Sequence, residues 1–497
     1  MSDTGSIHNV VQRTSRSRIP DDERGESTAA TNSSPRPQAE KPQSEPGPLG
    51  DNGRVYRMAN RFLRRGKRKI GVVESFRALL FSSWLNLFIV FIPIAWVAHF
   101  LHWADGLTFV LCFLAIIPLE KLFDYGGEQM TFYLGADLGE LLVITLNNIV
   151  EATLGVILLT KCELKLLQST IIGVILLHLL LIPGIAFVTG GANVMEQDLH
   201  PHLTQLNHTL LTIGVMTLLL PAAFFAALDR RSAGAAVAES FVNDTNRGKF
   251  LQMSRGLAIV LLVVYICSRI FLINPPGEGN AELAHHKLAP EALKLRALEL
   301  ENEEPEVNQW VCIGMLCVTI AIMASTAEWL VDSVEFVREA GGIEEEWFGL
   351  ILLPLVSFAG DGFLAIVYFF SSWYRYFRGQ AMPAATLAHA RPIDLSIQFI
   401  LFWMPFTVLL GWWTGRPMSL LFDLFEVALV ISSCFIVNYV TADSKTNWAE
   451  GFAMLAFYVM IALCSWFYTG QKDIDFMLAC PTSVEAALAA GVEVVLE

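Results

Sequence analysis

Long apolar stretches recur along the chain, and they constrain its fold more than any other feature. Windows of about 20 apolar residues, the length that crosses a bilayer as a helix, occur about eleven times. Apolar residues make up 54% of the 497 positions and charged residues only 16%. The chain is therefore predicted to be an all-α membrane protein with about eleven transmembrane helices. The expected spans are residues 79–101, 104–123, 136–160, 167–188, 206–228, 253–273, 309–329, 346–370, 393–413, 418–440 and 450–468.

Polar segments separate these spans into regions. The basic cluster "RFLRRGKRK", Arg61 to Lys69, precedes the first span and predicts a cytosolic N-terminus by the positive-inside rule. The expected regions are a disordered cytosolic tail (1–55), a basic juxtamembrane segment (56–78), a first transmembrane half (79–273), an acidic connector (274–308), a second transmembrane half (309–468) and a C-terminal tail (469–497).

Several classes of function are not expected. The net charge of −14 comes from acids in loops and inside spans, so nucleic-acid binding is not predicted. The polar first 50 residues lack the apolar core of a cleavable signal peptide. Eight cysteines lie singly, so neither a disulfide framework nor a zinc site is expected, and most are predicted to be small core residues. The chain has no nucleophile elbow, HExxH motif or phosphate loop, so it is predicted to be no enzyme and to need no cofactor.

The two halves carry similar patterns of acids. Each half has an acidic helix followed by a span with a central carboxylate, Glu151 in the third span and Asp361 in the eighth. Repeats with an odd number of helices must be inverted relative to each other in the membrane. The sequence therefore predicts one extra N-terminal helix and two inverted five-helix repeats. In the acidic helix of the first half, one face carries Glu120, Asp124, Glu128 and Thr131. In the acidic helix of the second half, one face carries Ser325, Glu328, Asp332 and Glu335.

A polar stripe runs along the third span. Asn147 and Glu151 share one face of this helix, and Asn148 lies beside them. A charged residue near the bilayer centre costs roughly 3 kcal/mol or more, so it normally faces a cavity, a partner or an ion path. Carboxylate and amide oxygens suit Ca²⁺ better than soft metals. An isolated Asn more often bonds a neighbouring helix, and His178 in mid-membrane is more often a packing residue, but two carboxylates at matching places favour an ion site.

Specific motifs resemble a known family. The segment "GELLVITLNNIVEATLGVILLTKCELKLLQSTIIG" is similar to the first repeat motif of the Ca²⁺/H⁺ antiporters, a branch of the cation/Ca²⁺ exchanger superfamily. Further similar segments are "LLLPAAF", "LILLPLV", "LLFDLFEV" and "VNYVTADSKTNWAEG", which extend the resemblance over nearly all of the membrane part. The resemblance implies eleven helices, a cytosolic N-terminus and a cation site built around Glu151 and Asp361. The resemblance is to a fungal-type vacuolar member of the family.

The sequence departs from the family pattern at several positions. Asn147 and Asn148 stand where the family has Gly-Asn, and Leu177 and His178 stand where it has Ser-Asn. The second motif, Gly-Asn-Ala-Ala-Glu-His in the family, is here Ser357 to Gly362, so the acid is the shorter Asp361 and Phe358 replaces an amide ligand. The second repeat motif is thus the divergent one.

The expected function is a secondary antiporter that exchanges cytosolic Ca²⁺ or a related cation for protons, by alternating access, across the membrane of the vacuole or another acidic organelle. Its expected partners are Ca²⁺ and protons as substrates and the lipid bilayer, with the oligomeric state left open. A monovalent cation/H⁺ exchanger and a non-transporting regulatory paralogue are the alternatives. The predicted site comprises Glu151 and Asp361 as the acids that bind Ca²⁺ or protons, Asn147, Asn148, Gln168, Ser357 and Gln398 as neutral ligands, and Glu128 and Glu328 as entrance or gating acids.

Overall fold

The structure, a computed structural model, describes residues 62–63, 70–191, 195–199, 201–232, 242–273, 304–378, 391–480 and 482–489. The chain divides into Met1–Asp51 and Asn52–Glu497, and every described residue lies in the second unit. The predicted tail 1–55, most of the basic segment and most of the acidic connector therefore lie outside the described residues.

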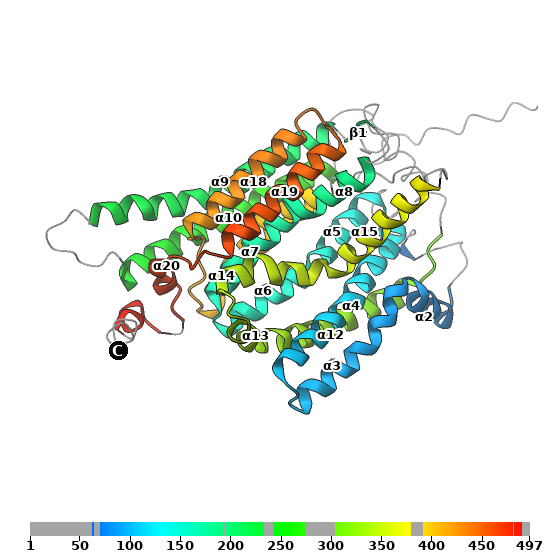
Figure 1. The fold of residues 1–497 in the computed structure, drawn as a ribbon, viewed down its shortest axis with the longest axis horizontal. Coiled ribbons are helices and arrows are strands. Elements are labelled where there is room, and N and C mark those ends of the chain that lie inside the picture. Colours follow the sequence, from blue (N-terminus) through cyan, green and yellow to red (C-terminus); the bar gives the residue numbers. More distant parts are fainter. Residues whose placement is uncertain are drawn as a thin grey trace, which may run out of the picture. The chain divides into compact units, whose positions relative to one another are not determined.

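Helices make up nearly all of the described chain (Figure 1). Those of the first half are α2 (Val72–Phe81), the 3₁₀ helix η1 (Trp84–Val90), α3 (Phe91–Phe100), α4 (Asp105–Leu134), α5 (Ala136–Asn147), α6 (Ile149–Lys161), α7 (Leu164–Leu176), the π-helix η2 (Leu177–Leu181), α8 (Ile182–Gly191), α9 (Pro201–Ser232) and α10 (Asp244–Ile273). Those of the second half are α12 (Gln309–Asp332), α13 (Val334–Gly341), α14 (Glu345–Trp347), the π-helix η4 (Phe348–Leu352), α15 (Leu353–Phe377), α16 (Arg391–Gln398), the π-helix η5 (Phe399–Trp403), α17 (Met404–Thr414), α18 (Leu424–Val440), α19 (Trp448–Ser465) and α20 (Lys472–Met477).

The prediction of a helical membrane protein is confirmed by the length and apolar character of these helices. Within the described residues, 7 helices are long and apolar enough to cross a membrane, or up to 9 if each of two bent pairs counts as one span. The expected spans 346–370 and 418–440 coincide with α14–α15 and with α18, which is a shorter apolar helix of 17 residues. The count of eleven stays a prediction.

The first expected span is broken rather than continuous. The expected span 79–101 contains a break, because α2 and the η1–α3 helix meet at an angle of 96°. Ser83 lies at this break in an extended conformation, and its hydroxyl accepts a hydrogen bond from the Leu85 backbone N–H at 3.2 Å. A side-chain cap of this kind satisfies a backbone donor that a helix start leaves open.

Local signals place the other helix ends. Asn308 caps α12 and Asp423 caps α18, each by accepting a hydrogen bond from a backbone N–H two residues ahead. Asn447 and Glu450 form a reciprocal capping box at the start of α19. Gly135 separates α4 from α5 with a φ of 94°, a conformation that only glycine adopts without strain.

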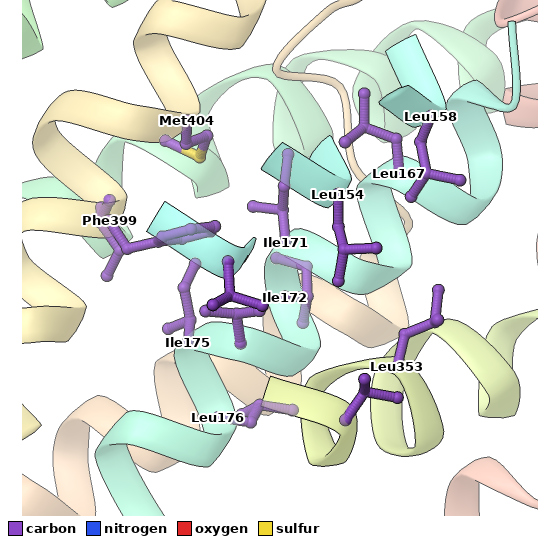
Figure 2. Packing of buried hydrophobic residues seen from close by; sticks show 14 of the residues in the cluster. Leu154, Leu158, Leu167, Ile171, Ile172, Ile175, Leu176, Leu353, Phe399 and Met404 are labelled. Atoms are coloured by element: carbon purple, nitrogen blue, oxygen red, sulfur yellow. The ribbon is translucent and has the colours of Figure 1, made fainter. Parts of the chain in front are cut away.

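The helix α7 lies at the centre of the core, where all its residues except Lys165 are buried. Figure 2 shows its leucine and isoleucine side chains between those of α6, α15 and the η5–α17 segment. The contact with the second half is close: a Cβ placed on Gly173 would lie 2.6 Å from Pro354 Cγ and closer still to the Leu350 carbonyl oxygen. Close backbone packing thus joins α7 to η4 and α15.

The contacts between helices come in matching pairs. The helix α4 packs on α12, and α9 packs on α18. The helix α8 packs on α19 while α10 packs on α17, and α7 packs on η4 while α16 packs on α5. Figure 1 shows α4 beside α12 and α8 beside α19.

One end of the helix bundle contains the end of α6, the starts of α7 and α10, the ends of α12 and α17, and α20. We call it the disulfide face, because Cys162 and Cys480 form a disulfide there. Lys161 pairs with Asp332, and Lys165 pairs with Glu346 at 2.6 Å and Asp475 at 2.9 Å. At the opposite end, the short strands β1 (Gln197–Asp198) and β2 (Lys445–Thr446) pair antiparallel. The start of α12 lies at that opposite end, where the Asn308 backbone N–H donates to Ser75 Oγ at 3.0 Å.

The cysteine prediction is wrong at two positions. Cys162 and Cys480 form a disulfide on the disulfide face, with their Cα atoms 5.6 Å apart and 318 residues apart in sequence. Of the six others, Cys112, Cys312 and Cys434 are buried, and Cys267, Cys317 and Cys464 are exposed. A pairing over this separation leaves no spacing pattern, because the tertiary fold alone brings the C-terminal segment back to the end of α6.

Candidate functional site

An acidic cavity of about 320 Å³ lies among helices of both halves. The residues around it come from α4, from α5 and α6, from η2 and α8, and from α15 and α16. Its polar lining residues are Glu120, Asp124, Glu128, Asn147, Glu151, His178 and Ser357. Four predicted site residues, Glu128, Asn147, Glu151 and Ser357, thus share one cavity.

Glu151 enters the cavity from a break in the third span. The helices α5 and α6 meet at Asn148 with a bend of 48°, so Glu151 lies in the first turn of α6. Its side chain is buried, with 4% of its surface exposed. Backbone N–H groups at a helix start carry partial positive charge, which stabilises a carboxylate at this position. The break therefore gives the buried acid a favourable environment inside an apolar bundle.

His178 faces Glu151 from the π-helical segment η2. The distance between His178 Nε2 and Glu151 Oε1 is 4.0 Å, and both side chains are buried. His178 Nδ1 finds no hydrogen-bond partner among the described residues. A π-helical turn inserts an extra residue into a helix and is frequent at functional sites. The structure therefore places His178, a weak candidate from sequence, in the wall of the cavity.

The acids of α4 also line the cavity, and a lysine of the same helix pairs with two of them. Lys121 Nζ lies 2.8 Å from Asp124 Oδ2 and 3.8 Å from Glu120 Oε1, and its side chain is buried. Glu128, one turn further along, is exposed and lies at the mouth of the cavity. The α4 part of the lining thus presents three carboxylates, and Lys121, which is not among the lining residues, pairs with two of them.

Asn147 and Asn148, neighbours in sequence, make different contacts. With its amide oriented to satisfy both acceptors, Asn147 Nδ2 donates to Asp124 Oδ1 at 2.9 Å and to the Val143 carbonyl at 3.0 Å. Asn148 is fully buried and donates to Gln398 Oε1 at 2.8 Å and to the Leu395 carbonyl at 3.3 Å. Asn147 therefore belongs to the acidic wall, whereas Asn148 holds α16 against the helix break.

The divergent second motif lies on α15. Ser357 lines the cavity and donates its hydroxyl hydrogen to the Pro354 carbonyl at 2.8 Å, and the ring of Phe358 also lines it. A Cβ on Gly360 would lie 2.9 Å from Glu120 Oε2 and 3.1 Å from Lys121 Cε. Asp361 follows directly on the same helix, and its side chain is outside the described part of the structure. The backbone beside Asp361 therefore contacts the α4 wall.

Besides Asn148, three predicted site residues are not among those that line the cavity, namely Gln168, Glu328 and Gln398. Gln398 Nε2 donates to Thr145 Oγ1 and to the Tyr265 hydroxyl, each at 2.9 Å. Gln168 Nε2 donates to the Ser419 carbonyl at 3.0 Å and the Leu421 carbonyl at 3.1 Å, near the start of α18. Glu328 is exposed on α12. Their predicted roles in cation binding or gating stay predictions.

No role was predicted for Lys121 or for Glu426, another of the buried carboxylates. Glu426 on α18 is 2% exposed and accepts a hydrogen bond from Ser169 Oγ at 2.6 Å. Both residues lie inside expected membrane segments, where a charged group is costly and marks a functional position. That cost was the signal that could have identified them.

The cavity offers a set of oxygen ligands to a cation. Carboxylates from α4 and α6 and the amide and hydroxyl oxygens of Asn147 and Ser357 are hard ligands of the kind that Ca²⁺ prefers. Among the described side chains, no group of three or more His, Cys, Asp or Glu is close enough to hold a metal ion.

Apolar helices that enclose an intramembrane acidic cavity define the class of secondary transporters. The family model of the sodium/calcium exchanger protein matches residues 311–467. The vacuolar calcium ion transporter of Schizosaccharomyces pombe is 31% identical over 80% of this chain and 88% of its own length. That of Cryptococcus neoformans is 29% identical over 88% of this chain and 82% of its own length. The solved structure of native YfkE has a TM-score of 0.57 at 20% identity, over 77% of this chain and 100% of that one. The chain belongs to the Ca²⁺/H⁺ antiporter family of the cation/Ca²⁺ exchanger superfamily.

Proposed function

We propose that the protein exchanges Ca²⁺, or a related cation, for protons across the membrane of the vacuole or another acidic organelle. The observation that carries this proposal is Glu151, a buried carboxylate at a helix break in the wall of an acidic cavity. Relatives named vacuolar calcium ion transporter, from two fungi, support the same substrate and membrane.

In the proposed mechanism, Glu151 and Asp361 bind either the cation or protons. A metal ligand must be deprotonated, so a proton and Ca²⁺ compete for the same carboxylate oxygens. Asn147 and Ser357 supply neutral oxygens beside Glu151, and Glu128 at the mouth attracts the cation. Binding of one substrate therefore releases the other, which couples the two fluxes.

Alternating access in this proposal comes from two inverted five-helix repeats. The matching helix contacts support it, because α10 on α17 mirrors α19 on α8, and α7 on η4 mirrors α16 on α5. The apolar windows of α7–α8 and α16–α17 are each 72% buried, and those of α10 and α19 are each 28% buried. The windows of α4 and α12, which also correspond in the two repeats, differ at 67% and 33% buried. Rocking of one repeat against the other would expose the cavity to each side in turn.

The proposed orientation has the N-terminus in the cytosol and the disulfide face in the organelle lumen. Disulfides persist in oxidising compartments and are rare in the cytosol, which supports a lumenal position for Cys162 and Cys480. Ser75, near the described N-terminal end, contacts Asn308 at the opposite end of the bundle. This arrangement agrees with the basic cluster that precedes the first span.

A flux assay tests the proposal. Vesicles that contain the protein and an acid interior should take up ⁴⁵Ca²⁺, and Glu151→Gln and Asp361→Asn should each abolish uptake. The matched control is Glu335→Gln, which removes an exposed carboxylate of α13 outside the cavity and should transport normally. Uptake that persists in Glu151→Gln would refute the mechanism. If both acid variants left cellular ion tolerance unchanged while deletion of the protein altered it, the chain would instead be a non-transporting regulatory protein.

Two residues favour a second candidate, a monovalent cation/H⁺ exchanger. The Lys121 ammonium cancels part of the negative charge of the α4 wall, and Phe358 places an aromatic ring where an oxygen ligand would otherwise lie. Ca²⁺ typically takes 6–8 oxygen ligands, so a cavity with fewer suits an ion of lower charge. Proton-driven ²²Na⁺ uptake without ⁴⁵Ca²⁺ uptake in the same vesicles would establish this function and exclude the first.

The proposed gating role of Glu328 is separable from cation binding. Glu328→Gln should slow uptake without changing the cation concentration that gives half-maximal rate, because the residue lies outside the cavity. Normal uptake by this variant would remove Glu328 from the mechanism.

A further inference from the structure

A second cavity, of about 280 Å³, lies on the disulfide face and shares no lining residue with the acidic cavity. Its walls come from the first turns of α10, from the end of α17 with the turn that follows, and from the C-terminal segment around Cys480. Among the described residues that line it, those that carry charge are Arg247, Arg255 and Arg416, all of them basic. The cavity is therefore basic, in contrast to the one in the membrane centre.

The arginines differ in how far their charge is neutralised. Arg247 lies 2.6 Å from Asp244 Oδ1 and donates to the Ala479 carbonyl at 3.0 Å. Arg416 donates to the Thr160 carbonyl at 3.0 Å and contacts the sulfur atoms of the disulfide. Arg255 stacks on the Trp412 ring, 4.8 Å from its centroid.

Among the described residues, no carboxylate lies within ion-pair distance of Arg255 or Arg416, and both side chains are half-buried. Two guanidinium groups without a counter-ion thus flank one small cavity. A guanidinium presents its N–H donors in a fixed fork that matches the oxygen atoms of a phosphate.

The cavity lies at the level where the bilayer is expected to meet water. Thr414 ends the apolar stretch Pro392–Thr414 and lines the cavity. The neighbouring Trp412 and Trp413 are 47% and 67% exposed, and tryptophan is enriched where a bilayer meets water. Lipid phosphates occupy this level, and solutes also have access to it. Its volume is near the lower end of the range for ligand pockets, about 300 to 1,000 Å³, which suits a phosphate or diphosphate group.

We propose that Arg247, Arg255 and Arg416 form a phosphate-binding site on the disulfide face. The phosphate belongs either to an anionic lipid headgroup or to a soluble phosphate or pyrophosphate. Basic pockets between membrane helices are a known way to hold lipid phosphates. Because Arg416 also contacts the end of α6, a bound phosphate joins α10, α17 and α6, the helix that carries Glu151.

The proposal can be tested without measuring ion exchange, through binding and stability of the full-length protein. For the soluble source, inorganic phosphate and pyrophosphate are titrated at constant ionic strength while thermal unfolding is followed in detergent. For the lipid source, the protein is placed in phosphatidylcholine nanodiscs with or without phosphatidic acid, and retained lipid is measured by native mass spectrometry. The test variants are Arg255→Gln and Arg416→Gln. The matched control is Arg338→Gln, which removes one positive charge from α13 outside the cavity.

We expect the wild type and the control to bind one of these probes. Each test variant should bind that probe with an affinity at least roughly tenfold lower, as expected for the loss of a charge-assisted hydrogen bond. Raised unfolding temperature with phosphate or pyrophosphate identifies the soluble source, and retained phosphatidic acid identifies the lipid. Arg255→Lys and Arg416→Lys keep the charge but lose the fork, so they should bind with intermediate strength and report on the site if the Gln variants fail to fold. Absence of binding by every probe, or equal binding by wild type and test variants, would overturn the proposal.

Discussion

The hydrogen bond between Asn148 and Gln398 joins the helix break of the first half to α16 of the second, and its energy can be measured. Asn148 is fully buried and donates to Gln398 Oε1 at 2.8 Å and to the Leu395 carbonyl at 3.3 Å. Both asparagine and glutamine were predicted as cation ligands, whereas their contacts indicate a positioning role. Asn148→Ala removes the donor from two buried acceptors and adds no new group.

The expected magnitude follows from these contacts. A buried acceptor that loses its donor costs about 1–3 kcal/mol, and hydrogen bonds between membrane helices average about 0.6 kcal/mol with a maximum near 1.7. We expect Asn148→Ala to lower the free energy of unfolding by about 2 kcal/mol. In a double-mutant cycle with Gln398→Ala, the contribution of Leu395 cancels, so the coupling energy of about 1 kcal/mol reports on the Asn148–Gln398 bond alone.

Unfolding by SDS titration in mixed micelles provides the measurement for the wild type, both single variants and the double variant. The matched control is Asn207→Ala on α9, because Asn207 is 2% exposed and its amide has no hydrogen-bond partner among the described residues. This control should lose no more than a few tenths of a kcal/mol, since it removes a buried polar group that bonds nothing described. A coupling energy within error of zero, or equal stability of the Asn148 and Asn207 variants, would refute the positioning role.

Further predictions concern packing, pH and the disulfide. Gly173→Ala should lower the free energy of unfolding by about 1–3 kcal/mol by forcing α7 away from η4. The control Gly314→Ala, with nothing within 4 Å of the added Cβ, should leave stability unchanged. Thermal unfolding of both variants checks this prediction, and equal melting points would contradict it. Burial raises the pKa of Asp475 from 3.8 to about 6, so the folded form binds this proton more tightly and the docking of α20 weakens as pH rises through that interval. Hydrogen exchange of α20 should therefore be slower at about pH 5 than at about pH 7 after correction for the intrinsic rate, and Asp475→Asn should remove the difference. Cys480→Ser should free Cys162 for alkylation and cost about 2–4 kcal/mol, the usual contribution of a disulfide that closes a long loop. Alkylation of both cysteines in the unreduced wild type would show that the bond is absent.

The class of membrane protein and part of the site were predictable because they depend on the free-energy cost of placing individual residues in the bilayer. An apolar stretch of about 20 residues is rarely compatible with any other location, and a carboxylate such as Glu151 within it demands a partner or a cavity. The same argument identified Asn147, and the family resemblance of the second motif identified Ser357; the structure places both in the cavity with Glu151. It also applies to Lys121 and Glu426, whose charge was visible in the sequence.

The hydrogen-bond partners of the neutral polar side chains were not predictable from the sequence. Gln168 and Gln398 have the chemistry of cation ligands, but their amides donate to backbone carbonyls and to neighbouring side chains instead. An amide satisfies its hydrogen bonds with whichever groups the packed helices bring within about 3 Å, and the choice depends on helix rotation and bend angle.

The sequence by itself determined that the chain is a helical membrane protein with costly acids in its spans, because hydropathy and charge act residue by residue through the solvent. The tertiary structure alone decided that Lys121 lies among those acids, that Cys162 meets Cys480 and that Arg247, Arg255 and Arg416 surround one cavity. These contacts join residues from separate helices, so they depend on how the helices pack and leave no periodic trace in the chain.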